Sequence, residues 1–170
     1  MNWQFRLRNL PNPIKGMLTT FILVMLFGYS SSFVLLADTT QLKAQGIEEN
    51  YLGNEDLPEA DGPLKFKKSK HEMMNIVHTH AFVLGILFLI TGYMIYFCGI
   101  PGWLKKFLMI EPLLSIIFTF GFILIVWKGY SSFKYLAMIS GIVMHLSFLS
   151  MLFLIIRELY FVRAQPPVKR

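Results

Sequence analysis

Four long hydrophobic stretches alternate with polar segments along the chain, at residues 17–37, 76–97, 107–127 and 135–156. Each is close to the length that an α-helix needs to cross a hydrocarbon core about 30 Å thick. Their apolar residues lie at every angle around the helix, as expected of helices immersed in lipid. The pattern therefore predicts an all-α membrane protein with four transmembrane helices.

The two short connectors, residues 98–106 and 128–134, contain sequences that break helices. Gly99-Ile100-Pro101-Gly102 lies in the first connector and Gly129-Tyr130-Ser131-Ser132 in the second. Connectors this short join neighbouring helices that run in opposite directions. We therefore expect an antiparallel four-helix bundle.

Lysine and arginine residues beside the spans predict the orientation, because cytoplasmic segments are enriched in them. The segments 1–16, 98–106 and 157–170 together carry Arg6, Arg8, Lys15, Lys105, Lys106, Arg157, Arg163, Lys169 and Arg170. Four lysines in residues 65–70 and two in residues 128–134 oppose the assignment. The balance places both termini in the cytoplasm and the segments 38–74 and 128–134 on the periplasmic side.

Composition narrows the class of protein further. The chain is 55% hydrophobic and 15% charged, whereas soluble domains carry about 25% charged residues. Its formal charge is +6, but no basic cluster is interleaved with aromatic residues, so we expect no nucleic-acid partner. The expected partners are the lipid bilayer and other membrane subunits. Cys98 is the single cysteine, which excludes a disulfide or a cysteine metal cluster within this chain.

Three segments of the chain leave alternatives open. The first span, 17–37, could be a signal peptide, but it exceeds the roughly 7 to 15 apolar residues of one, which favours an uncleaved helix. Residues 1–16 suit either an interfacial segment in the headgroup layer or a frayed tail. The loop 38–74 holds eight of the ten acidic residues and changes from acidic to basic along its length. It either packs on the bundle, which we favour, or lacks fixed structure.

The loop and the second span also carry a recognisable motif. The residues that form it are Thr40, Gly46-Ile47, Tyr51-Leu52-Gly53-Asn54-Glu55, Lys68-Ser69, Glu72, His78-Thr79-His80 and Phe82. This pattern resembles four-helix bacterial inner-membrane proteins with a periplasmic G-[IV]-x-x-x-Y-x-G loop followed by H-x-H, some of them encoded near respiratory cytochromes. The resemblance covers roughly residues 37–85. It implies a bacterial inner (cytoplasmic) membrane and an association with respiratory proteins.

Three histidines are candidate cofactor ligands: His78 and His80 near the periplasmic end of the second span, and His145 midway along the fourth. A group of this kind at membrane depth indicates a site by default. Haem b held between helices needs two neutral imidazoles that face each other at matching depth. By helical rise His80 lies about 6 Å inside its span and His145 about 15 Å inside, so the helices must tilt to form the pair. A quinone between the helices is the other cofactor we consider.

A metal site at the periplasmic face is a second hypothesis, with His71, His78 and His80 as ligands beside Glu72. On an ideal helix His78 and His80 point about 200° apart, and His71 and His78 are about 10.5 Å apart along the axis. Only an unwound helix start would gather all three. The alternative without a ligand is that these rings lie at headgroup depth and bind loop backbone.

Helical position gives three further expectations. We expect His80 to be buried, because it shares a helical face with the apolar residues Met73, Val77, Leu84 and Leu87. The ring of His145 follows Gly141 by one turn and can hydrogen-bond a neighbouring helix without a cofactor. Glu111, just before Pro112, is expected in the first turn of the third helix, where a carboxylate complements the helix N-terminus.

The sequence contains no complete catalytic motif, so enzyme activity is not predicted for the chain by itself. Two functions are consistent with the pattern. The first, which we favour from the sequence, is a small inner-membrane subunit linked to electron transport, with a b-type haem or quinone between helices. The second is a non-enzymatic structural or assembly factor of a membrane complex, which the lack of depth-matched histidines favours.

Overall fold

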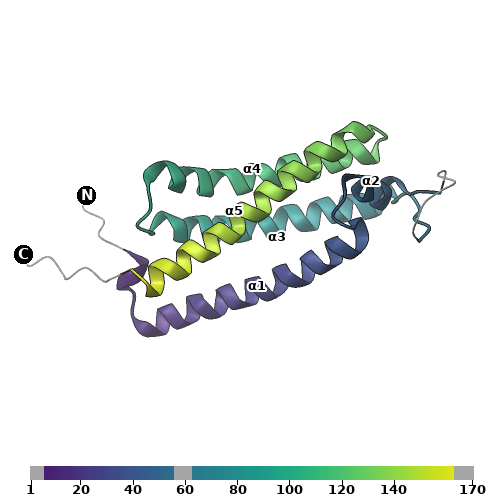
Figure 1. The fold of residues 1–170 in the computed structure, drawn as a ribbon. Coiled ribbons are helices and arrows are strands. Elements are labelled where there is room, and N and C mark those ends of the chain that lie inside the picture. Colours follow the sequence, from purple (N-terminus) through teal and green to yellow (C-terminus); the bar gives the residue numbers. More distant parts are fainter. Residues whose placement is uncertain (1–5, 56–62, 163–170) are drawn as a thin grey trace, which may run out of the picture.

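The fold is built from helices that run back and forth along one axis (Figure 1). The computed structural model describes residues 6–55 and 63–162, and within these ranges there is no β-strand. In chain order the helices are η1 (Leu7–Asn9), α1 (Asn12–Thr40), α2 (Ala44–Leu52), α3 (Lys70–Tyr96), α4 (Gly102–Trp127), η2 (Ser131–Phe133) and α5 (Lys134–Tyr160). Four of them, α1, α3, α4 and α5, are long and apolar enough to cross a membrane. The predicted all-α bundle of four long helices is confirmed.

The long helices begin at local signals rather than at the first apolar residue. The Ser69 hydroxyl accepts a hydrogen bond from the Glu72 amide while the Glu72 carboxylate accepts one from the Ser69 amide, and this capping box starts α3 at Lys70. Pro101 immediately precedes the first residue of α4. Hydropathy reports only the part of a helix that suits lipid, so the helices extend beyond most of the predicted span ends.

The early start of α4 corrects the expectation for Glu111. Because α4 begins at Gly102, Glu111 lies nine residues inside it and not in its first turn. Pro112 is likewise inside the helix, where it has no amide hydrogen to donate to the carbonyl of Leu108. A carboxylate complementing the helix N-terminus is therefore the wrong interpretation.

The centre of the bundle is formed mainly by α4 and α5. In the most apolar window of each long helix, 39% of residues are buried in α4 and 33% in the segment containing α5, compared with 11% in α3 and 6% in α1. The hydroxyls of Thr119 and Ser140 are hydrogen-bonded, and a Cβ added to Gly141 would lie 3.8 Å from Thr119. Small residues at this crossing allow α4 and α5 to approach closely.

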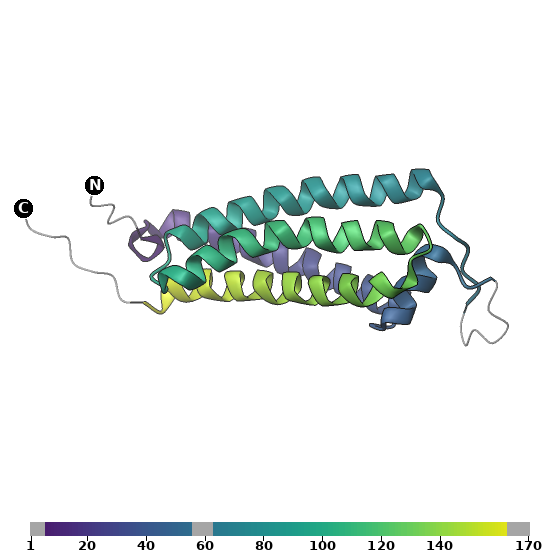
Figure 2. The ribbon, with the colours of Figure 1, turned by 90° about the horizontal axis from the view of Figure 1, so that it is seen from above.

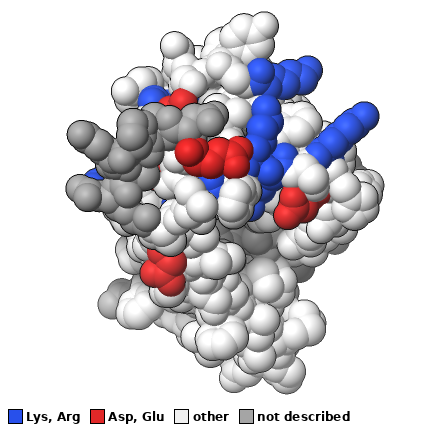
Figure 3. All heavy atoms as spheres, turned by 90° about the vertical axis from the view of Figure 1, so that its right-hand side faces the viewer, with Lys and Arg blue, Asp and Glu red and all other residues white. Residues whose placement is uncertain are grey.

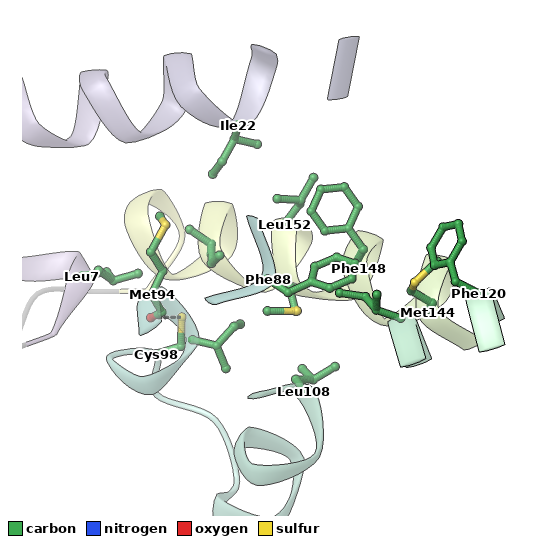
Figure 4. Close-up of a cluster of buried hydrophobic side chains, with 14 of the residues drawn as sticks. Leu7, Ile22, Phe88, Met94, Cys98, Leu108, Phe120, Met144, Phe148 and Leu152 are labelled. Atoms are coloured by element: carbon green, nitrogen blue, oxygen red, sulfur yellow. Dashed lines mark hydrogen bonds between the residues drawn. The ribbon is translucent and has the colours of Figure 1, made fainter. Parts of the chain in front are cut away.

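A continuous hydrophobic cluster joins the long helices (Figure 4). Phe88 of α3 and Phe148 of α5 lie with ring centroids 5.7 Å apart. From α1, Ile22 points toward this cluster and is 1% exposed. Figure 1 shows much of the rest of α1 apart from α3, α4 and α5, and only 6% of the most apolar window of α1 is buried.

The two ends of the molecule differ. We call the end that carries α2 the cap end, and the end that carries η1 and the last turn of α5 the termini end. The described chain enters and leaves at the termini end (Figure 2). Since α3 and α5 both run from the cap end to the termini end, they are parallel to each other and antiparallel to α4.

Candidate functional site

Polar side chains of the described chain gather in three places: the cap end, the membrane-spanning helices and the termini end. At the cap end the loop between α1 and α3 is folded against itself. Asn54, 4% exposed, donates from Nδ2 to the carbonyl of Pro63 (3.3 Å), and its Oδ1 accepts from the amide of Lys65 (2.7 Å). Its own amide donates to the carbonyl of Lys65 (2.9 Å), and Lys68 donates from its amide to the Tyr51 carbonyl (3.1 Å). The two arms of the loop are thereby joined, and we call α2 together with residues 53–55 and 63–69 the cap.

Two glycines make the loop possible. A Cβ on Gly46 would lie 1.9 Å from the carbonyl oxygen of Thr40, so no other residue fits where α2 crosses the end of α1. Gly53 has φ +87°, and a Cβ there would lie 2.8 Å from the Lys65 carbonyl oxygen. The motif residues Thr40, Gly46, Gly53 and Asn54 therefore shape the cap.

The cap is held to the bundle by polar contacts. Lys134 of α5 donates from Nζ to the Glu48 carboxylate (2.6 Å) and to Gln45 (2.7 Å), and Trp127 donates from Nε1 to the carbonyl of Lys68 (2.7 Å). Figure 3 shows acidic and basic side chains side by side at this end. Partial burial opposes ionisation of Glu48, but the bonds from Lys134 and Ser131 outweigh it and hold its pKa below the ordinary value.

The histidines of α3 are exposed. The ring of His78 lies 4.8 Å from Phe82 of the same helix, and the ring of His80 lies 5.0 Å from Phe120 of α4. Nδ1 of His80 is 2.8 Å from the carbonyl oxygen of Ile76, one turn earlier. The expected burial of His80 is wrong: α3 lies at the edge of the bundle, so its ring is covered on one side only.

His145 of α5 is half-buried beside α1. Its Nδ1 lies 2.6 Å from the Gly141 carbonyl oxygen, and its ring lies 5.5 Å from that of Tyr29. Tyr29 in turn lies 5.7 Å from Phe148. Tyr29 of α1 and His145 of α5 are thus in contact although they are far apart in the sequence. Neither residue spacing nor hydropathy predicts this contact.

The structure does not bring His80 and His145 face to face. The Phe88–Phe148 contact sets the register of α3 against α5. Measured from it, His80 is eight residues, about 12 Å, toward the cap end, whereas His145 is three residues, about 4.5 Å, toward it. The two rings differ in depth by about 7.5 Å and contact different helices, α4 and α1. Haem ligation by this pair stays a prediction.

No metal site is assembled by His71, His78 and His80. Across residues 6–55 and 63–162, no group of three or more His, Cys, Asp or Glu side chains is placed to hold a metal ion. The three histidines lie on a continuous part of α3, whose first residue is Lys70. The helix start is therefore not unwound as a shared site would require.

A line of polar side chains crosses the membrane part of α4. Ser115 donates from its hydroxyl to the Glu111 carboxylate, and Thr119 one turn further is paired with Ser140 of α5. The second carboxylate oxygen of Glu111 is buried without a hydrogen-bond partner in the described part of the chain. The spacing of four between Glu111, Ser115 and Thr119 is visible in the sequence, and a search for polar residues on one helical face would have found it.

Residues 41–166 match the family Aq_1264_TM, a transmembrane helical domain. The chain belongs to this family. The matched region runs from the corner after α1 through α2, α3, α4 and α5, so it includes the cap and all three histidines of α3. The chain matches no curated protein. It also matches no solved structure.

Proposed function

We propose that the protein is a non-catalytic structural subunit of a bacterial inner-membrane assembly, and that α1 is the helix that contacts its partner. The observation that carries this proposal is the sparse packing of α1, in which 6% of the most apolar window is buried. That helix also precedes the matched family domain, which starts at residue 41. A long helix with few contacts inside its own chain has most of its surface available to another membrane protein.

The outward face of α1 suits close helix contact. A Cβ added to Gly28 would meet nothing within 4 Å, and Ser31 and Ser32 are exposed beside it. Small residues one turn apart let two helices approach in lipid, where dispersion and weak hydrogen bonds supply the attraction. Phe27, 77% exposed, is a large neighbour that can pack on a partner.

Site-specific photo-crosslinking in native membranes tests this proposal. A photoreactive phenylalanine at Phe27 should give one discrete adduct with a membrane protein, while the same group at Phe153 of α5, 68% exposed, should give none. Adding Gly28→Leu should abolish the Phe27 adduct, because the larger side chain keeps the partner helix away. The proposal is contradicted if Phe27 and Phe153 give adducts in equal yield, or if Gly28→Leu does not change the yield of the Phe27 adduct.

A second candidate is a subunit linked to electron transport through haem b or a quinone. The contact between Tyr29 and His145 favours it, because a phenol and an imidazole at mid-membrane depth are both able to bind a polar ligand group. The test for haem is a reduced-minus-oxidised spectrum of protein expressed with haem supplied, compared with His145→Ala, His80→Ala and His78→Ala. Absorption bands that vanish in His145→Ala support haem ligation by this residue. A wild-type protein without b-type bands contradicts the haem hypothesis and favours the structural function.

A further inference from the structure

A hydrophobic groove of about 410 Å³ runs between α4 and α5. It lies in the half of the membrane nearer the termini end. Its lining residues are Leu104, Phe107, Leu108, Val143, Leu146, Ser147, Ser150, Phe153 and Leu154. Neither the cap nor the histidines contribute to it. The volume falls within the range of about 300 to 1,000 Å³ that binds single ligands.

The groove arises from the way the two helices cross. Near the cap end Thr119, Ser140 and Gly141 hold α4 and α5 close together. Toward the termini end the helices diverge (Figure 1). Ser147 and Ser150 add little volume to the gap, while Phe107 and Phe153 line it with large rings.

The length of the groove suits one leaflet of a bilayer. From Val143 to Leu154 it follows twelve residues of α5, whose eleven steps of about 1.5 Å give about 16 Å of helix. Half of a hydrocarbon core about 30 Å thick is about 15 Å. A partner helix would need a contact surface along the full thickness of the hydrocarbon core. An acyl chain of one leaflet needs a groove only about half that long.

The mouth of the groove at the termini end carries a cation. Arg157 is exposed and follows the lining residues Phe153 and Leu154 by about one helical turn. Within the described chain its guanidinium has no hydrogen-bond or ion-pair partner. Trp103, 72% exposed, precedes Phe107 by one turn on the opposite wall. Tryptophan is typical of the headgroup layer, and arginine binds phosphate through paired N–H groups.

We propose that the groove between α4 and α5 binds one anionic phospholipid. The acyl chain lies along Val143–Leu154, and the phosphate of the headgroup binds Arg157 beside Trp103. The occupant is a lipid because an apolar groove one leaflet long ends at a cation that nothing else in the described chain neutralises. Lipid bound in this way fills the gap where α4 and α5 separate.

Native mass spectrometry of the full chain tests the site, with phosphatidylglycerol and phosphatidylcholine of the same acyl chains as probes. Wild-type protein should retain one phosphatidylglycerol about fivefold more strongly than phosphatidylcholine, since one basic residue at the surface supplies roughly that factor. Arg157→Gln should remove the preference between the headgroups. Ser150→Leu, which fills the groove from an exposed position, should reduce retention of both lipids.

Two matched variants control for charge and bulk. Lys15→Gln removes a cation near the start of α1, and Ser30→Leu adds the same bulk to an exposed serine of α1; neither should change lipid retention. Equal retention of both lipids by the wild type, or wild-type retention by Ser150→Leu, overturns the proposal. The proposal is also overturned if the wild type is a dimer that Ser150→Leu dissociates while lipid stays bound. That result would mean that the groove binds a second copy of the chain. If Ser150→Leu does not fold, Arg157→Gln still decides the headgroup preference.

Discussion

At the scale of single residues, Asn54 has the most specific role in the cap. Its side chain and amide make three hydrogen bonds to Pro63 and Lys65 across the loop, and the side chain is nearly fully buried. Replacing it with alanine leaves the Lys65 amide without this acceptor, a loss that costs about 1 to 3 kcal/mol when the group stays buried.

We therefore expect Asn54→Ala to open the loop. Hydrogen exchange of the amides in residues 63–69 should become about tenfold faster or more in the variant, since 1.4 kcal/mol is a factor of ten in opening. The neighbouring Glu55→Ala serves as the control, because Glu55 is exposed. Unchanged exchange in Asn54→Ala would show that the contacts of Gly53 and Tyr51 hold the loop without it.

At the scale of elements, η1 covers the turn between α3 and α4. Arg6 donates from Nη1 to the Cys98 carbonyl (2.9 Å), and Leu7 is buried. The Glu158 carboxylate of α5 accepts from the Gly99 amide (2.9 Å) and lies 3.9 Å from Arg8. Burial, together with the charge of Glu158, raises the pKa of the Cys98 thiol to about 12.

The single cysteine thus reports whether η1 is in place. The thiolate is the reactive form, so a raised pKa and burial should make Cys98 of the wild type react slowly with maleimide at pH 8. Arg6→Ala should raise the labelling rate about tenfold or more, because it releases η1 from the turn. Lys106→Ala, an exposed change at the same end, should leave the rate unaltered. Equal rates in wild type and Arg6→Ala would mean that the helices alone protect the thiol.

The contact of α2 with α5 should depend on pH. Glu48 has a lowered pKa in the folded protein, so its stabilising contribution is fully present above the ordinary carboxyl pKa of 4.5. The contribution is lost as pH falls through the lower, folded value. Protonation of Glu48 removes the negative charge that pairs with Lys134, so it breaks the ion pair.

We expect the protection of the α2 amides, corrected for intrinsic exchange, to fall below pH 4.5 in the wild type. Glu48→Gln should lower protection at pH 7 by about 1 kcal/mol and remove the acid-dependent step. Glu49→Gln, one residue further, is the matched control and should keep the step. A wild-type profile without any change in this range would contradict the assignment of the ion pair.

At the scale of the whole molecule, the cap end and the termini end should face opposite sides of the membrane. Lys43 is exposed at the cap end and Lys106 at the termini end. In a Cys98→Ser background, Lys43→Cys should react with a membrane-impermeant maleimide from the periplasmic side and Lys106→Cys only after the cytoplasmic side is opened. The expectation rests on the excess of cations around the termini end. The reverse labelling pattern would mean that the cap end faces the cytoplasm.

The number of long helices and the position of the apolar part of each could be predicted because they depend on local properties. Uninterrupted apolar runs define the part of each helix that suits lipid, and Ser69 with Glu72 is a start signal contained in four consecutive residues. Glu111 shows the limit of this reasoning: its place deep in α4 depends on a helix start at Gly102, five residues before the apolar run that indicated the span.

The sequence by itself determined that four helices of this chain suit lipid, and it marked Thr40, Gly46, Gly53 and Asn54 as residues of one motif. Only the tertiary structure decided what lies beside what. Whether His80 meets His145 depends on the axial register of α3 against α5, which the Phe88–Phe148 contact sets. Whether α1 packs on the bundle depends on the corner at Thr40 and Gly46. The groove between α4 and α5 likewise exists because these helices are close at Gly141 and apart at Ser150. Hydropathy carries no information about such registers and crossing points, because lipid-facing and helix-facing residues are equally apolar.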